Sequence, residues 1–355
     1  MRVLVTGGAG FVGSRIAAAL VRDQPGTEIV ALDNLRRRGS ETNLPLLTAL
    51  GARFVHGDVR VRADLDQIEG TVDVLIDASA EASVLAGLDG SPAYVLDTNL
   101  TGTMNCLDWA RQRAGAVLFL STSRVYSIAP LRDLALRETD TRFELSPEQS
   151  VPGAGPEGVS ERFPTNLPRS FYGASKLASE MLVQEYTDSY GLPSVITRCG
   201  VITGAGQFGK SEQGVFAMWA ANHVYGRPLR YIGFEGTGKQ VRDLMHPEDL
   251  VDLLRRQLDA IDRCAGRVFN AGGGRAGSVS LRELTEICRD AAGREVPVSS
   301  EPRTTAVDIP VYISDHARAT RELGWRPTWT PRAMIGEIVD WVRTNEDLLR
   351  PVLGQ

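Results

Sequence analysis

The sequence predicts an α/β protein with a doubly wound parallel sheet and a smaller second domain of mixed α/β structure. Three observations support this fold class: short apolar runs alternate with helical patterns, the runs are apolar at nearly every position, and a glycine-rich turn joins the first run to the first helix. Strands that helices cover on both faces carry such runs, and strand–helix alternation produces parallel βαβ units. A chain of 355 residues is long enough for two domains. We expect the first at residues 1–203 with about 240–272, and the second at about 204–239 and 273–355.

Strands and helices can be assigned in order along the chain. The predicted strands are Val3–Thr6, Ile29–Leu32, Arg53–His56, Val72–Ile76, Ala116–Leu120 and Ser194–Thr197. The predicted helices include Phe11–Arg22, Thr98–Arg113, Tyr172–Tyr190, Leu281–Ala292, Asp315–Leu323 and Pro331–Thr344. The strict alternation weakens after Gly204, which is why the second domain is placed there.

The stretch between Tyr126 and Ser170 interrupts this pattern. It contains several prolines and glycines and many carboxylates, without clear periodicity. Such a stretch is either a solvated surface loop or a functional lid, because long structureless loops are uncommon inside compact domains.

The composition excludes several classes of protein. Hydrophobic residues make up 43% and charged residues 23%, which excludes intrinsic disorder. The formal net charge of -5 argues against nucleic acid or an anionic membrane as a partner, and no apolar stretch approaches the roughly 20 residues of a membrane span. The four cysteines and four histidines are scattered, so we expect no disulfide, no metal site and a cytoplasmic location.

A glycine-rich motif, TGGAGFVG at residues 6–13, follows the first strand and opens the first helix. In this context Gly7 permits a tight turn, Gly10 lets the backbone approach a pyrophosphate, and Gly13 allows close packing of helix on strand. Asp33 ends the second strand twenty residues later, where a carboxylate can bind ribose hydroxyls. These features predict a Rossmann sheet that binds a dinucleotide at the N-terminus of the first helix.

The carboxylate of Asp33 favours NAD over NADP because it would repel a 2′-phosphate. The run Arg36-Arg37-Arg38 could favour NADP instead, although such runs are more often solvated. Asp58, after the third strand, is placed either to meet the adenine or to cap the next helix.

Tyr172 and Lys176 lie four residues apart on one face of a predicted helix. The chain has only two other lysines, Lys210 and Lys239, so a lysine here is an uncommon choice. A free tyrosine has a pKa near 10, about three units above neutrality, and a nearby ammonium would lower it. Tyr172 could then take a proton from a substrate alcohol, and Thr122 could hydrogen-bond the same oxygen. The alternatives are a surface pair and a turn threonine.

Together these motifs resemble the extended short-chain dehydrogenase/reductase family. The resemblance covers nearly the whole chain: besides the glycine motif it includes DTNLTGT at 97–103, LSTSRVY at 120–126, YGASK at 172–176, RDLMH at 242–246 and LGWRP at 323–327. It implies NAD-dependent chemistry on nucleotide-activated sugars, with Thr122, Tyr172 and Lys176 in the catalytic roles. The expected cofactor contacts are Gly7, Gly10, Phe11, Val12, Gly13, Asp33, Asn34, Asp58, Val59, Ala78, Ser79, Ala80, Asn99, Ser121, Tyr172 and Lys176.

The residues after Thr122 bear on the branch of the family. The 4,6-dehydratases carry an Asp-Glu pair there as acid and base for losing water, whereas this chain has Ser123 and Arg124. The closest resemblance is to the CDP-tyvelose (CDP-paratose) 2-epimerase branch, in Thr122–Tyr126 and in the segments 206–208, 212–214 and 238–243. It suggests substrate contacts at Ser123, Arg124, Gln207, Gln213, Gln240 and Arg242.

Within that set, Arg242 is expected on the sugar nucleotide's pyrophosphate, because a guanidinium fork fits phosphate oxygens. Its alternative is an ion pair with Asp243 or Glu248, and the alternative for the glutamines is a place on the surface.

Three departures from the family's pattern leave the sugar open. Asp77-Ala78-Ser79-Ala80-Glu81 stands where the family more often has His-Leu-Ala-Ala, Ser127 replaces a usual glycine, and the 126–170 stretch is longer than usual. None of them removes a catalytic group.

The sequence therefore predicts an NAD-dependent epimerase that inverts C2 of a CDP-(deoxy)hexose through a transient 2-keto sugar. The alternatives are a UDP-sugar 4-epimerase with the same machinery and a non-catalytic NAD-binding protein. The resemblance also implies a homodimer, joined through the helices predicted at Thr98–Arg113 and Tyr172–Tyr190.

Overall fold

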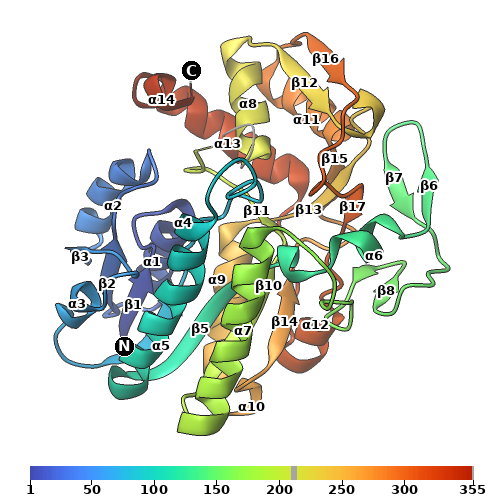
Figure 1. Cartoon of the computed structure of the whole chain (residues 1–355). Helices are drawn as coiled ribbons and strands as arrows, with labels where there is room; N and C mark the ends of the chain where they lie inside the picture. Colours follow the sequence, from blue (N-terminus) through green and yellow to red (C-terminus); the bar gives the residue numbers. More distant parts are fainter. Residues whose placement is uncertain (209–213, 354–355) are drawn as a thin grey trace.

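The computed structural model describes residues 1–208 and 214–353, and its centre is a seven-stranded parallel sheet (Figure 1). The strands are β1 (Arg2–Thr6), β2 (Glu28–Asp33), β3 (Arg53–His56), β4 (Val72–Asp77), β5 (Ala114–Thr122), β10 (Ser194–Cys199) and β14 (Val268–Ala271). Their order across the sheet is β14-β10-β5-β4-β1-β2-β3, so the winding reverses between β1 and β4. Doubly wound sheets bind ligands at the carboxyl edge of such a reversal.

Helices cover both faces of this sheet, which confirms the predicted fold class. One face packs against α1 (Phe11–Asp23), α2 (Leu44–Ala49), α9 (Pro247–Asp259) and α12 (Ala317–Leu323). The other packs against α3 (Arg62–Asp66), α5 (Gly102–Arg113) and α7 (Phe171–Tyr190). Along β1, Val3 and Val5 enter the first core while Leu4 enters the second, and this is why the strand is apolar throughout.

The predicted elements agree with the structure at six of the seven strands of the large sheet, and β14 was missed. Its four residues include Asn270, which breaks the apolar run. The side chain of Asn270 is nevertheless fully buried, because its amide donates to the Val159 carbonyl at 2.8 Å and its oxygen accepts from the Tyr126 hydroxyl at 2.7 Å. The helix predicted from Thr98 begins with a π-helical turn, η2 (Asp97–Thr101).

A second core lies beyond the carboxyl edge of the sheet, at the top of Figure 1. It is formed by α8 (Val215–Tyr225), α11 (Leu281–Ala292) and α13 (Pro331–Thr344) with the parallel pair β12 (Leu229–Ile232) and β16 (Val298–Glu301). A small sheet joins the two cores: β13 (Val241–Met245) pairs with β11 (Val201–Ile202), β15 (Ser278–Ser280) and β17 (Val311–Tyr312). Shorter elements are η1 (Ser40–Asn43), α4 (Ala93–Leu96), η3 (Ser123–Val125), η4 (Phe234–Gly236), α10 (Ile261–Cys264) and α14 (Glu346–Leu353).

Residues 126–170, which we call the insertion, are folded, so of the two alternatives for this stretch the solvated loop is wrong. They contain α6 (Ile128–Arg132), the hairpin β6 (Leu136–Glu138) with β7 (Phe143–Leu145), and the pair β8 (Ala154–Gly155) with β9 (Gly158–Val159). Side chains such as Leu131, Leu145 and Phe163 form a core with residues 309–313. Sequence periodicity missed this core because its partners come from a segment about 150 to 180 positions further along the chain.

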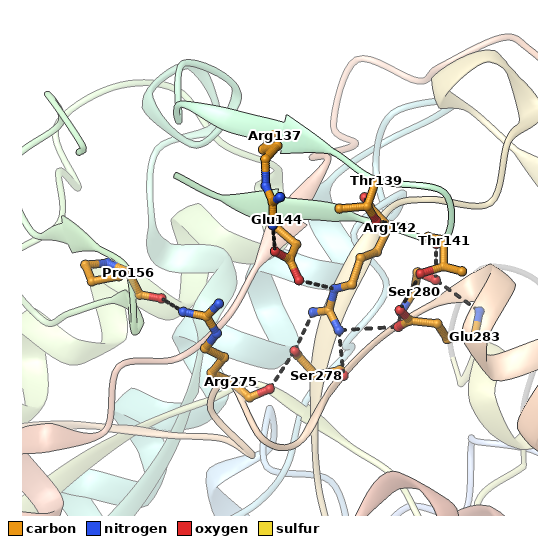
Figure 2. A network of polar contacts seen from close by, with 10 residues as sticks. All are labelled: Arg137, Thr139, Thr141, Arg142, Glu144, Pro156, Arg275, Ser278, Ser280 and Glu283. Atoms are coloured by element: carbon orange, nitrogen blue, oxygen red, sulfur yellow. Dashed lines mark hydrogen bonds and ion pairs between the residues drawn. The ribbon is translucent and has the colours of Figure 1, made fainter. Parts of the chain in front are cut away.

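Polar contacts hold the hairpin of the insertion against β15 and α11 (Figure 2). Arg142 donates to the Ser278 hydroxyl at 2.6 Å and forms an ion pair with Glu283 at 3.3 Å. Thr141 donates to Glu283 and its carbonyl accepts from Ser280. At the base, Ser127 exchanges hydrogen bonds with the backbone of Leu167 and so closes the two ends of the insertion.

All four cysteines are free thiols in buried positions. None of the described helices combines the length and the apolar character needed to cross a membrane.

Candidate functional site

A cavity of about 450 Å³ opens at the carboxyl edge of the sheet, where the winding reverses. Its walls come from the loops after β1, β2, β3 and β4 and from the segment around Phe208. Most of the predicted cofactor residues line it: Gly7, Gly10, Phe11, Val12, Gly13, Asp33, Asn34, Val59, Ala78, Ser79 and Ala80. The strand ends therefore gather these residues into one concave site.

The glycine turn fits a pyrophosphate for steric and electrostatic reasons. A Cβ atom at Gly13 would lie 2.2 Å from the carbonyl oxygen of Gly7, so only glycine lets α1 start this close to β1. The N-terminus of α1 has no side-chain cap and no acidic residue in its first turn. Its N–H groups and the helix dipole are thus available to a negatively charged group.

Asp33 lies at the end of β2 beside this turn, buried in the cavity wall. Its carboxylate accepts the Ala9 N–H at 3.1 Å and the Leu35 N–H at 2.8 Å. Burial raises the pKa of Asp33, and these backbone bonds oppose that rise. Asn43, which sequence reasoning did not single out, donates to the Ala9 carbonyl at 2.8 Å and fixes the other side of the turn.

Asp58 does not itself line the cavity, although its neighbours Gly57 and Val59 do, and it does not cap a helix; its adenine contact stays a prediction. Arg60 forms an ion pair with it at 2.7 Å and lowers the pKa of the Asp58 carboxyl to about 2. Asn34 also donates to Asp58, which orients that wall residue. Arg36 stacks on the ring of Tyr94, and both line the cavity.

Asn99 lies behind the cavity wall rather than in it. Within η2, its amide donates to the Glu81 carbonyl and to the Ser175 hydroxyl, both at 3.0 Å, and its oxygen accepts the Glu81 N–H at 2.8 Å. Asn99 thus ties the loop after β4 to α7, and that loop carries the lining residues Ala78–Ala82.

Tyr172 and Thr122 meet at the buried start of α7. Ser170 caps this helix by accepting the Gly173 N–H at 3.2 Å. A Cβ atom at Gly173 would lie 2.1 Å from the Arg124 carbonyl oxygen, so glycine lets α7 pack directly on the turn after β5. The side chains of Tyr172 and Thr122 are hydrogen-bonded as a result.

The charge environment of Tyr172 is mixed. Burial raises its pKa to about 12, the hydrogen bond from Thr122 and the charge of Arg124 lower it, and Glu81 raises it. Lys176, one helical turn on, is also buried, and its ammonium donates to the Ser79 carbonyl at 3.4 Å. Because Ser79 lines the cavity, Lys176 reaches the cofactor wall from behind.

Ser121, a predicted cofactor contact, is hydrogen-bonded within the protein. Its hydroxyl donates to Glu180 on α7, and Glu180 forms a bidentate ion pair with Arg198 on β10, with a shortest contact of 2.6 Å. Arg198 in turn lies over the ring of Tyr126. This buried network joins β5, α7 and β10, and no sequence motif indicated it.

Two buried arginines lie near this part of the site, and the charge of one of them, Arg124, acts on Tyr172. Arg124 donates to the Val307 carbonyl at 3.4 Å, and Arg242 donates to the Ile309 carbonyl at 2.8 Å. Burial and the nearby charge of Arg124 lower the pKa of Arg242 to about 10. The nearest carboxylate to Arg242 is Asp308, at 3.7 Å, so the expected alternative of a pair with Asp243 or Glu248 was wrong.

The predicted glutamines lie in different places. Gln207 lines the cofactor cavity, and its amide is bonded to Thr203 and to the Ile202 carbonyl. Gln240 donates to the Ile232 carbonyl at 3.0 Å, while its buried side-chain oxygen has no hydrogen-bond partner among the described residues. Ser123 begins η3 beside Thr122. Gln213 lies outside the described residues.

With this site in view, comparison with known proteins identifies the class. The chain belongs to the NAD dependent epimerase/dehydratase family, whose model matches residues 3–272. Its homologues are NAD-dependent nucleotide-sugar epimerases and dehydratases, so the protein is an enzyme of this kind and NAD is its cofactor. The expected membership in the extended short-chain dehydrogenase/reductases is confirmed.

Individual relatives cover almost the whole chain. A CDP-paratose 2-epimerase from Salmonella typhi is 28% identical over 351 residues, which are 96% of this chain and 99% of the relative. The structure of a dTDP-glucose 4,6-dehydratase from Streptomyces venezuelae with NAD bound has a TM-score of 0.79 at 28% identity and covers 99% of this chain and 100% of its own. That of a UDP-glucose 4-epimerase from Thermotoga maritima with UDP-glucose has a TM-score of 0.78 at 25% identity, covering 98% and 100%.

Proposed function

We propose that the protein is an epimerase that inverts C2 of a CDP-(deoxy)hexose. The observation that carries this proposal is the set of side chains around Tyr172. Thr122, Tyr172 and Lys176 supply what alcohol oxidation needs, whereas Ser123 and Arg124 offer no carboxyl pair for the loss of water. The similarity to a CDP-paratose 2-epimerase supports C2 as the inverted carbon and CDP as the nucleotide of the substrate.

In the proposed mechanism Tyr172 takes the proton of the C2 hydroxyl, and Thr122 hydrogen-bonds the same oxygen. Bound NAD supplies the hydride acceptor and, once reduced, the hydride donor. The sugar passes through a 2-keto form, turns in the pocket, and receives its proton back from Tyr172 at the inverted alcohol. Lys176 holds its positive charge behind the cofactor wall and favours the phenolate of Tyr172.

Arg124 and Arg242 form the proposed binding site for the substrate's phosphates. Arg124 and Arg242 are buried side by side with Asp308 as their shared carboxylate, and their other contacts are backbone carbonyls. A diphosphate would meet both guanidiniums better than neutral carbonyls do, because charge-assisted pairs are stronger. We therefore assign Arg124 and Arg242 to the nucleotide's diphosphate.

The test is to incubate the purified protein with CDP- and UDP-hexoses, without added cofactor, and to follow each sugar by proton NMR in deuterated water. Inversion at C2 without deuterium in the product is the expected result. Inversion at C4 would keep the machinery and move the assignment to a UDP-sugar 4-epimerase. A protein that holds NAD and converts no sugar would contradict the proposed function; Tyr172→Phe, which should retain NAD but lose turnover, is the control.

We also propose that the protein forms a homodimer through α5 and α7. Met104 on α5 and Met181 and Tyr190 on α7 are large apolar side chains exposed to solvent, and Met181 is 62% exposed. The two helices lie side by side over one face of the sheet. Light scattering should give twice the chain mass of 38.5 kDa, and Met181→Glu should shift the measured mass towards that of the monomer.

The predicted domain boundaries and cytoplasmic location stay predictions.

A further inference from the structure

Asp77 is a buried carboxylate at the carboxyl end of β4, only 1% exposed. One of its oxygens accepts from the Thr6 hydroxyl at 2.7 Å and from the hydroxyl and N–H of Ser79 at 2.7 and 3.2 Å. The other accepts from the Thr103 hydroxyl at 3.1 Å. All of these donors are neutral, so they satisfy an ionised carboxylate without cancelling its charge.

Lys176 is the complementary case. Its side chain is 2% exposed, and its ammonium donates to the Ser79 carbonyl and lies 4.5 Å from the centre of the Phe119 ring. Among residues 1–208 and 214–353, no ion pair joins either Lys176 or Asp77 to an oppositely charged side chain. Two buried charges without contact partners are costly unless each compensates the other.

Ser79 connects the two groups. Its N–H and hydroxyl donate to Asp77, while its carbonyl accepts from Lys176. We propose that Asp77 is the counter-charge of Lys176 and that, through Ser79, it sets the position of the ammonium behind the cofactor wall. Asp77 is then a positioning residue, since it acts through Lys176 and Ser79.

The other groups that face Lys176 leave this role to Asp77. Glu180 on α7 is already paired with Arg198. Burial raises the pKa of the Cys106 thiol on α5 and of the Cys199 thiol on β10, to about 12 for Cys199, so both are neutral at physiological pH. Burial also lowers the pKa of Lys176, and Asp77 is the foremost of the charges that oppose this.

The consequence for catalysis rests on the proposed function. If Tyr172 ionises with the help of an ammonium at Lys176, that ammonium must stay protonated in a buried place. A carboxylate at position 77 would maintain its charge, and a neutral side chain there would not.

The experiment measures the ionisation of Lys176 directly. The chain has three lysines, so protein labelled with carbon-13 in lysine alone gives three sets of side-chain NMR signals, and Lys176→Arg identifies the one that matters. In Asp77→Asn, protein with NAD bound and free of it should show Lys176 titrating at a pH lower by about one unit or more, a tenfold loss of proton affinity. In Thr103→Val, which removes one donor to Asp77 but keeps its charge, the titration should stay within a few tenths of a unit.

A second variant keeps the test decisive if Asp77→Asn does not fold. Asp77→His keeps a hydrogen-bonding side chain at this position and supplies no negative charge. Folded protein, checked by thermal melting, should show the same downward shift for Lys176. An unchanged Lys176 titration in either folded variant, or an equal shift in Thr103→Val, would overturn the proposal.

These outcomes separate the inference from the proposed function. If the wild-type protein converts no sugar but the Lys176 titration shifts in Asp77→Asn, the proposed epimerase activity is contradicted and the role of Asp77 as counter-charge is supported. If Asp77→Asn loses turnover while its Lys176 titrates as in the wild type, the role of Asp77 as counter-charge is contradicted and the proposed epimerase activity is not. The acidic limb of the pH–rate profile should move to higher pH in Asp77→Asn, since a neutral Lys176 no longer favours the phenolate.

Discussion

The two sides of the site are built from contacts of different range. On the cofactor side, the loops at the carboxyl edge of the large sheet form the cavity, and single residues near each strand end shape it, such as Gly13 and Asp33. On the substrate side, segments far apart in the sequence meet: Arg124 bonds to Val307, and Arg242 to Ile309. The hairpin of the insertion is held against α11 by Arg142 and its neighbours (Figure 2).

The two sides therefore differ in what determines their residues: backbone geometry on the cofactor side and long-range packing on the substrate side. The cofactor side depends on backbone geometry that parallel strands impose, so its residues recur with a fixed spacing. The substrate side depends on which distant segments pack together, and the insertion has its own small core for this purpose. The proposed catalytic residues lie at the boundary: Thr122 ends β5, Tyr172 begins α7, and the charge of Arg124 acts on Tyr172.

The largest expected difference concerns ion pairs. Glu180→Gln leaves Arg198 buried without its partner, and we expect it to lower the free energy of unfolding by about 3 kcal/mol or more. The matched change Glu144→Gln removes a partner of the exposed Arg137 on the insertion and should cost less than about 1 kcal/mol. Chemical denaturation measures both. Equal losses would contradict the distinction between a buried and a solvated network.

Glycines give the next largest contrast. Gly13→Ala places a methyl group against the Gly7 carbonyl, so NAD binding should weaken by about 100-fold or more, or about 2.7 kcal/mol. Gly336→Ala, in the middle of α13, meets no atom within 4 Å and should stabilise the protein by about 0.5–1 kcal/mol through helix propensity. Calorimetric titration and thermal melting check the pair. Normal NAD affinity in Gly13→Ala would show that the turn is not where the pyrophosphate binds.

Arg242→Gln tests the substrate side alone. It removes one guanidinium of the proposed diphosphate site, so we expect KM for the nucleotide sugar to rise by about 10- to 100-fold while NAD content stays constant. The matched control is Arg132→Gln, since Arg132 also donates to the carbonyls of Thr305 and Asp308, but from the exposed side. A similar rise in KM for both variants would trace the effect to the loop at 305–310 instead of to phosphate binding.

The smallest expected effect distinguishes two aspartates by pH. Asp58 has its pKa lowered to about 2 by Arg60, so its contribution to stability is present above about pH 4 and is lost as pH falls through 2. Asp243 on β13 has its pKa raised to about 6 by burial, so its contribution is present below about pH 4 and is lost as pH rises through 6.

Asp243→Asn should therefore gain about 1–2 kcal/mol of stability over the wild type between pH 4 and pH 8. Asp58→Asn should be less stable than the wild type above about pH 4, and this difference in stability should shrink as the pH falls towards 2. Urea denaturation across pH 3–8 measures both. A stability difference that does not vary with pH in Asp243→Asn would contradict the raised pKa.

Much of the cofactor side could be predicted from the sequence because its signals are local. The glycine motif, Asp33 and the Tyr172–Lys176 spacing each lie within one strand–helix unit, where backbone geometry limits the choice of residue. The sequence does not choose between a solvated loop and a lid for the insertion, because its core needs Val311 and Tyr312, and it does not reveal the ion pair of Asp58 with Arg60. Neither partner was recognised from spacing alone.

The sequence by itself determined the doubly wound sheet, the position of the dinucleotide turn and the chemical groups at the catalytic positions. These follow from apolar periodicity and from residue types that only particular backbone geometries accept. Only the tertiary structure decided which charges are compensated: Glu180 by Arg198, Arg242 near Asp308, and Asp77 across Ser79 from Lys176. The reason is physical, because burial makes an uncompensated charge costly, and burial depends on how distant segments pack.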